Sequence, residues 1–110
     1  MSAAPTSAPA HQLAARATTR FGSDAKGKIV YWTEPHDGLF SAEIKCDTGY
    51  SVYLTDTPQG KVSLEVLGEG TATVESEVVA PDSESACDKV RTYLAKYGVC
   101  DIANHGSMLA

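Results

Sequence analysis

The stretch LFSAEIKCDTGYSVYLTDTPQGKVSLEVL, residues 39–67, decides the fold, because apolar and polar side chains alternate along three of its segments. A period of two is typical of strands with one buried and one solvated face. Two short loops rich in Gly, Pro, Asp and Thr separate the segments, as expected for tight turns. We therefore predict antiparallel strands at 39–46, 50–56 and 61–67. Their inward side chains are expected to be Phe40, Ala42, Ile44, Cys46, Val52, Leu54, Val62, Leu64 and Val66.

Similar segments flank this stretch. KIVYWT at 28–33 is β-branched and aromatic, and TATVESEVV at 71–79 again alternates. In the latter segment we expect Ala72, Val74 and Val78 to point inward. The five segments, joined by short loops, predict a meander, and VCDIA at 99–103 is a candidate sixth strand.

The string SESACDKVRTYLAKY at 83–97 has apolar residues at the spacing of one helical face, and Gly98 follows as a stop. We therefore predict an α+β fold: an antiparallel β-meander of five to six strands with one C-terminal helix packed on one face. The second face of the sheet should be solvated or meet a polar partner. Its expected side chains are Ser41, Glu43, Lys45, Ser51, Tyr53, Thr55, Ser63, Glu65, Thr73, Glu75 and Glu77, with either Tyr31 or Trp32 beside them.

The N-terminal residues 1–26 are rich in Ala, Ser, Thr and Pro, so they cannot form a core alone. We predict a flexible N-terminal arm at 1–26, a domain at 27–103 and a C-terminal tail at 104–110. Residues 11–20 would accept a helix, but so short a helix is marginal in water without a surface to lie on.

Two other interpretations of the arm stay open. It is a candidate cleaved organelle presequence, because it contains Arg16 and Arg20 and no acidic residue before Asp24. It is equally a candidate for a disordered tail that has no function. A secretory signal lacks its continuous apolar region, so an intracellular or virion location is favoured over secretion.

Charge is distributed unevenly along the chain, whose formal net charge is −5. The first 30 residues hold four basic and one acidic side chain, whereas residues 31–110 hold five basic and thirteen acidic ones. An acidic body repels phosphates, which argues against direct nucleic-acid binding. The apolar runs are only a few residues long, far below the roughly 20 that a membrane-spanning helix needs.

Few residues are candidates for catalysis or metal binding, and we predict no cofactor, metal or catalytic residue. Glu34, His36 and Asp37 share one loop, but three polar residues in a Pro-Gly turn are most often a solvated turn. His11 and His105 fall in the two tails, where we expect exposure to solvent. The three cysteines match no common metal or redox spacing and are interpreted as reduced thiols.

The sequence thus favours a binding role over catalysis, and two functions remain. The first is a structural or assembly protein, such as a minor subunit or a capsid-decorating protein, that binds a protein partner or forms an oligomer through its arm and sheet. The second is an acidic inhibitor or adaptor that blocks a basic surface, such as that of a nucleic-acid-binding enzyme. The candidate partner-binding residues are Leu13, Arg16, Arg20, Phe21, Tyr53, Glu65, Glu75 and Glu77.

Overall fold

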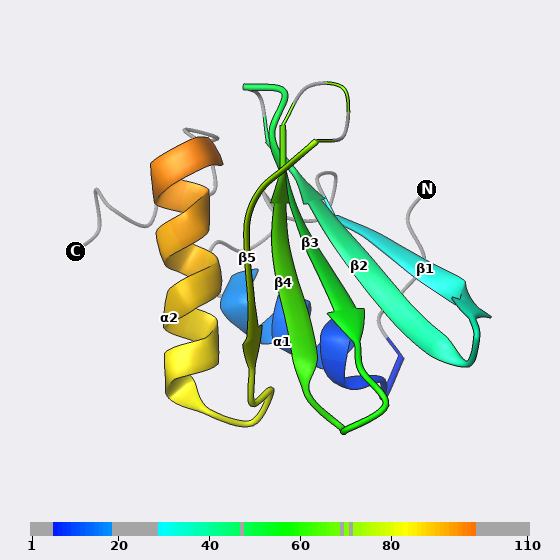
Figure 1. The fold of residues 1–110 in the computed structure, drawn as a ribbon. Helices are drawn as coiled ribbons and strands as arrows, with labels where there is room; N and C mark the ends of the chain where they lie inside the picture. Colours follow the sequence, from blue (N-terminus) through cyan, green and yellow to red (C-terminus); the bar gives the residue numbers. More distant parts are fainter. Residues whose placement is uncertain (1–5, 19–28, 47, 69, 71, 99–110) are drawn as a thin grey trace.

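The computed structural model describes residues 6–18, 29–46, 48–68, 70 and 72–98 (Figure 1). These residues form a five-stranded antiparallel sheet flanked by an N-terminal and a C-terminal helix, which confirms the predicted α+β meander. The elements are α1 (Pro9–Thr18), β1 (Ile29–His36), β2 (Leu39–Lys45), β3 (Ser51–Asp56), β4 (Val62–Leu67), β5 (Thr73–Val79), α2 (Glu84–Tyr93) and a π-helical turn η3 (Leu94–Gly98). The candidate strand at 99–103 lies outside the described residues.

Neighbouring strands of the sheet follow the order of the chain, β1-β2-β3-β4-β5, because each connection is a short turn. The turn before β4 shows the local cause: the Gly60 N–H donates to the Thr57 carbonyl at 3.1 Å, and the Thr57 N–H donates to the Lys61 carbonyl at 2.9 Å. Gly60 has a φ of 79°, a backbone conformation that only Gly adopts without strain. The tight turn predicted between the segments 50–56 and 61–67 is therefore confirmed.

Both helices lie on the same side of the sheet, which we call the covered face. The opposite side, which no described element covers, is called the open face. The side chains directed to the open face include Val30, Trp32, Ser41, Glu43, Lys45, Ser51, Tyr53, Thr55, Ser63, Glu65, Leu67, Thr73, Ser76 and Val78.

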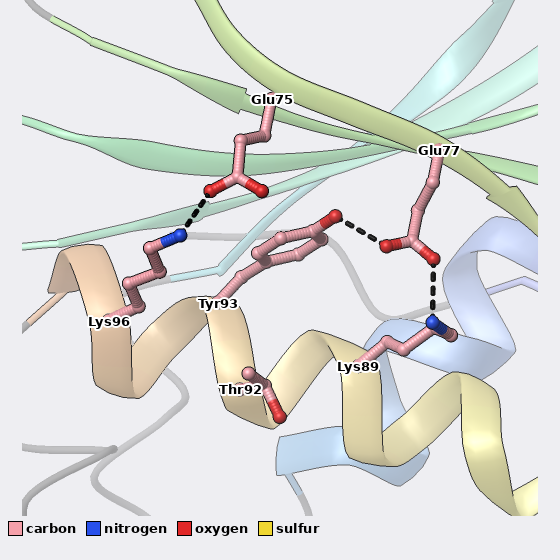
Figure 2. A pocket seen from close by; sticks show the side chains of 6 residues that line it. All are labelled: Glu75, Glu77, Lys89, Thr92, Tyr93 and Lys96. Atoms are coloured by element: carbon pink, nitrogen blue, oxygen red, sulfur yellow. Dashed lines mark hydrogen bonds and ion pairs between the residues drawn. The ribbon is translucent and has the colours of Figure 1, made fainter.

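Strand β5 faces the opposite way from the prediction at Glu75, Glu77 and Val78, so the prediction is wrong for these residues. Thr73, which pairs with Leu67 and donates to Glu65, lies on the open face as predicted. Leu64 pairs with Glu77 and Val66 with Glu75, so both carboxylates point to the covered face, toward α2 (Figure 2). Val74 and Val78 are 47% and 59% exposed. The register shifts between Val66 and Leu67, and the extra residue reverses the facing of the β5 side chains that follow it. Tyr and Lys side chains of α2 and η3 satisfy the two carboxylates there.

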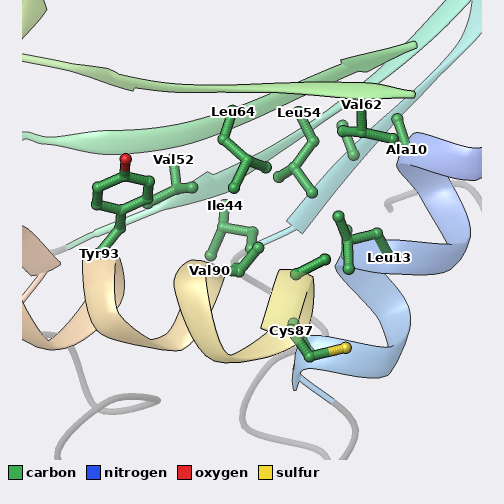
Figure 3. Packing of buried hydrophobic residues seen from close by; sticks show 14 of the residues in the cluster. Ala10, Leu13, Ile44, Val52, Leu54, Val62, Leu64, Cys87, Val90 and Tyr93 are labelled. Carbon is green, nitrogen blue, oxygen red and sulfur yellow. The ribbon is translucent and has the colours of Figure 1, made fainter. Parts of the chain in front are cut away.

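The hydrophobic core fills the space between the covered face and the two helices (Figure 3). The alternation predicted for β2, β3 and β4 is confirmed, since their inward aliphatic side chains are buried. The fully buried strand residues are Ala42, Ile44, Val52, Leu54, Val62, Leu64 and Val66. The helices contribute Ala10, Leu13, Ala14 and Ala17 from α1 and Ala86, Cys87, Val90 and Tyr93 from α2.

Helix α1 is part of this core, so the predicted flexible arm is wrong for residues 9–18. Ala10, Leu13, Ala14 and Ala17 recur at the spacing of one helical face and have no exposed area. The Asp56 carboxylate accepts a hydrogen bond from the Ala10 N–H at 2.7 Å, which caps the N-terminus of the helix. The Arg91 guanidinium donates to the Ala17 carbonyl at 3.0 Å near its C-terminus. The boundary predicted after residue 26 lies outside the described residues.

Helix α2 begins as predicted, because the Ser83 hydroxyl accepts a hydrogen bond from the Ala86 N–H at 3.1 Å. The helix widens to the π-helical turn η3, which ends at Gly98, the residue predicted to stop it. Cys46 and Cys87 are free thiols, whereas Cys100 lies outside the described residues. Among the described residues, neither helix has the length and the apolar composition needed to cross a membrane.

Candidate functional site

On the open face the exposed aromatic side chain of Trp32 lies among polar side chains and the aliphatic Val30, Leu67 and Val78. Trp32 is 46% exposed, and it pairs in register with Ser41 of β2. The Ser41 and Tyr53 hydroxyls lie 3.3 Å apart, so they form a hydrogen bond. Trp32, Ser41 and Tyr53 therefore make a continuous patch across β1, β2 and β3, which we call the Trp–Tyr patch.

The predicted ambiguity between Tyr31 and Trp32 is resolved by this register. Tyr31 pairs with Ala42 and packs against the core, so it points to the covered face. Partial burial raises the pKa of the Tyr31 hydroxyl, because the phenolate would lose hydration. Trp32 is therefore the aromatic that faces outward.

Two carboxylates flank the Trp–Tyr patch. Glu43 and Glu65 are the cross-strand neighbours of Tyr53, on β2 and β4. The Glu65 carboxylate accepts a hydrogen bond from the Thr73 hydroxyl at 3.1 Å. Tyr53 and Glu65, two of the predicted partner-binding residues, are thus brought together on the open face.

Glu75 and Glu77 form a separate cluster on the other side of the sheet (Figure 2). They line a shallow slot of about 300 Å³ between β5 and α2, which we call the β5–α2 slot. The Tyr93 hydroxyl donates to Glu77 at 2.6 Å, and the Lys89 ammonium lies 2.9 Å from the same carboxylate. The slot is lined by Glu75, Glu77, Lys89, Thr92, Tyr93 and Lys96.

The contacts of Glu75 follow the same pattern. Lys96 Nζ lies 2.9 Å from Glu75 Oε2, and the Tyr97 hydroxyl donates to the same oxygen. Each of the two carboxylates is therefore held by one Tyr and one Lys from the α2–η3 segment. These contacts attach the end of the helix to the edge strand of the sheet.

These hydrogen bonds shift the pKa values of the cluster away from neutral pH. The bonds from Tyr97 and Lys96 lower the pKa of Glu75, and those from Tyr93 and Lys89 lower the pKa of Glu77. Burial, and then the bond to Glu77, raise the pKa of Tyr93. A general acid or base works best when its pKa lies near the working pH. The cluster is therefore suited to holding charges in place rather than to moving protons at neutral pH.

His11 is fully buried, so the predicted solvent exposure of this residue is wrong. Its Nε2 lies 2.8 Å from the Ser41 carbonyl and 3.2 Å from the Trp32 carbonyl. Its Nδ1 accepts from the Thr6 N–H at 3.0 Å, so the proton of the ring resides on Nε2. The ring also makes edge-on contacts with two aromatic side chains, at centroid distances of 5.2 Å to Tyr31 and 5.5 Å to Phe40.

This geometry gives His11 a structural role. The imidazole ties α1 to the main chain of β1 and β2 directly beneath the Trp–Tyr patch, because its two carbonyl acceptors belong to Trp32 and Ser41. The sequence carries no signal for this role, since the neighbours Ala10 and Gln12 do not indicate the carbonyls that His11 meets. His105 lies outside the described residues.

The remaining predicted partner-binding residues are scattered. Leu13 is fully buried under the sheet, and the Arg16 guanidinium donates to the Pro81 carbonyl at 2.7 Å. Arg20 and Phe21 lie outside the described residues. Leu13 can therefore meet a partner only if α1 leaves the sheet.

The predicted loop is wrong for Glu34 and His36, because both lie in strand β1. Asp37 lies in the short turn that joins β1 to β2 and has a φ of 55°. Within the described part of the chain, no group of three His, Cys, Asp or Glu residues is placed to hold a metal ion. Comparison with protein-family models, with curated proteins and with solved structures found no match to this chain.

Proposed function

We propose that this protein is a non-catalytic structural or assembly component that binds a partner protein through the open face of its sheet. The Trp–Tyr patch carries this proposal. Trp and Tyr are enriched among the residues that dominate protein interfaces, and both lie here on strands whose other face packs against the core.

The position of α1 changes how the partner would be contacted. An arm that threads over a neighbour would need free side chains, but Leu13 is buried and Arg16 is bonded within the domain. The open face has no such cover among the described residues. We therefore assign partner binding to the sheet rather than to residues 9–18.

A second candidate function is an acidic inhibitor or adaptor that blocks a basic surface. Glu43 and Glu65 favour it, because they flank Tyr53 on the open face of an acidic body. Glu75 and Glu77 support it less, because their charges are already compensated by lysines. The two functions differ in their response to salt, since screening weakens contacts between exposed charges far more than it weakens aromatic burial.

The test is capture of partners by the full chain and by Trp32→Ser in the source cells, followed by quantitative mass spectrometry. Lys61→Ser is the matched control, because Lys61 is exposed on a turn remote from the Trp–Tyr patch. We expect Trp32→Ser to reduce the captured partner by about tenfold or more while Lys61→Ser leaves it unchanged. If Trp32→Ser does not change the amount of captured partner but high salt abolishes capture, the acidic inhibitor is favoured instead.

A further inference from the structure

The glutamates on the two faces of the sheet differ in their partners. On the covered face, Glu75 and Glu77 each lie 2.9 Å from a lysine. On the open face, the Glu65 carboxylate accepts a hydrogen bond from the Thr73 hydroxyl at 3.1 Å. Within the part of the chain that the structure describes, neither Glu65 nor Glu43 forms an ion pair with Lys or Arg. The open face thus holds two carboxylates whose charge no described ion pair compensates.

These two carboxylates lie on either side of Tyr53. Tyr53 pairs in register with Glu43 of β2 and with Glu65 of β4. Residues directly opposite each other on neighbouring strands have Cβ atoms about 4.5–5.5 Å apart, so both glutamates border the Tyr53 side chain. Lys45 belongs to the same face and is exposed, but it pairs with Ser51 and is only a diagonal neighbour of Tyr53. A cation above Tyr53 would therefore have two carboxylates as direct neighbours and one lysine farther away.

The Tyr53 side chain lies across the strands rather than upright on the sheet. Its hydroxyl is 3.3 Å from the Ser41 hydroxyl, and Ser41 is a diagonal neighbour on β2 because it pairs with Thr55. Diagonal neighbours are about 7–8 Å apart, so the ring reaches Ser41 only by leaning over β2. An approaching group therefore meets the side of the ring, with Trp32, 46% exposed, beside it.

A guanidinium group matches this arrangement better than an ammonium group does. It is planar, it stacks on aromatic rings, and it donates to a carboxylate through two parallel N–H groups. An ammonium group is a strongly hydrated point charge without this fork of donors. Arginine is also one of the residues that most often dominate the binding energy of protein interfaces.

We propose that the open face binds an arginine side chain of the partner protein, with its guanidinium group on Tyr53 between Glu43 and Glu65 and with Trp32 beside it. This inference rests on the protein-binding role proposed above and names the residue that the partner presents. The occupant is chosen by charge complementarity, since the two carboxylates require a cation and the two aromatic rings favour a planar one. Salt screens such an enclosed pair less than it screens an exposed one, so the contact is compatible with stable assembly.

The experiment uses the full chain labelled with ¹⁵N and a capped pentapeptide, Gly-Leu-Arg-Leu-Gly, whose leucines supply apolar contact for Trp32. In two control peptides the arginine is replaced by citrulline, which is planar but uncharged, or by lysine, which is charged but not planar. We expect saturable binding of the arginine peptide, with shifts at the Trp32 indole N–H and at the amides of Glu43, Tyr53 and Glu65. The lysine peptide should bind about threefold more weakly and the citrulline peptide about tenfold more weakly.

Matched Glu→Gln variants localise the charge contact. The double variant Glu43→Gln/Glu65→Gln should weaken the arginine peptide by about tenfold and leave the citrulline peptide unchanged. Glu84→Gln removes one such charge at the exposed first turn of α2, which packs on the covered face. This control should change binding of the arginine peptide by less than about twofold. The amide spectrum of each variant shows whether it is folded.

Four results would overturn the proposal. They are no saturable binding, equal binding of the arginine peptide and either control peptide, a double variant that behaves like Glu84→Gln, and shifts confined to the β5–α2 slot. Partner capture that still depends on Trp32 would then leave the proposed function standing. If the arginine peptide instead binds as expected but partner capture does not depend on Trp32, the arginine site stands and the proposed function is contradicted.

Discussion

The two faces of this sheet are built from the same strands but have different surroundings. On the covered face, alternate residues such as Ile44, Leu54 and Leu64 have no exposed area and meet two helices. On the open face, their neighbours Tyr53 and Glu65 are polar side chains in partial contact with solvent. Changes on the covered face should therefore alter stability, whereas changes on the open face should alter binding with little loss of stability.

The largest expected effect is in the core. Leu64→Ala should lower the free energy of unfolding by about 2–5 kcal/mol, because it removes buried contacts and leaves a cavity. Thr55→Ala on the open face should change it by less than about 0.5 kcal/mol. Urea denaturation of both variants measures the contrast, and equal losses would show that the two faces do not differ as described.

The next effect concerns the attachment of α1. His11→Ala should lower the free energy of unfolding by about 2–3 kcal/mol, because the Ser41 and Trp32 carbonyls lose their shared donor. Ser7→Ala, an exposed position near the same helix, is the control and should be nearly neutral. A neutral His11→Ala in urea denaturation would mean that α1 does not contribute to the covered face in solution.

A smaller loss is expected at the cap of the same helix. Asp56→Ala removes the carboxylate that accepts from the Ala10 N–H, and it should cost about 1 kcal/mol. Hydrogen exchange of the α1 amides should accelerate more than that of the α2 amides. Uniform acceleration across both helices would contradict a local role for Asp56.

The smallest effect lies in the β5–α2 slot and depends on pH. The pKa of Glu77 in the folded protein is below its ordinary value of 4.5, so the folded state binds this proton more weakly than the unfolded state does. The resulting stability is present above about pH 4.5 and is lost as the pH falls through the lowered pKa. Glu77→Gln should reduce the loss of unfolding free energy over this pH range by less than about 1 kcal/mol, since the Glu77–Lys89 pair is partly exposed. If the pH dependence of the free energy of unfolding is unchanged in Glu77→Gln, protonation of Glu77 does not contribute to it.

The strands β2, β3 and β4 could be predicted because each has an unambiguous alternation and a turn with Gly or Pro at each end. Strand β5 was ambiguous, since Val78 and Val79 are adjacent and only one of them can point inward. The facing of β5 is decided by its register with β4 and by the Tyr and Lys side chains that reach Glu75 and Glu77. Tertiary contacts of this kind leave no local pattern in the sequence.

Helix α1 escaped prediction as part of the core for a related reason. Its buried stripe is mostly Ala, whose small side chains give a weak hydrophobic signal but allow close approach to the sheet and to α2. Its caps, Asp56 and Arg91, are far away in the sequence. On the open face, the positions of Tyr53 and Glu65 were predicted by alternation, whereas the outward aromatic of β1 required the register that the structure provides.

The measurement that tests the open face most directly is photo-cross-linking of the full chain in its source cells. A p-benzoylphenylalanine side chain replaces Tyr53 on the open face or, in a second variant, Ala95 on the exposed side of η3. If the open face binds the partner, position 53 should give a discrete adduct and position 95 should not. An adduct from position 95 alone, or from neither position, would contradict the assignment of partner binding to the open face.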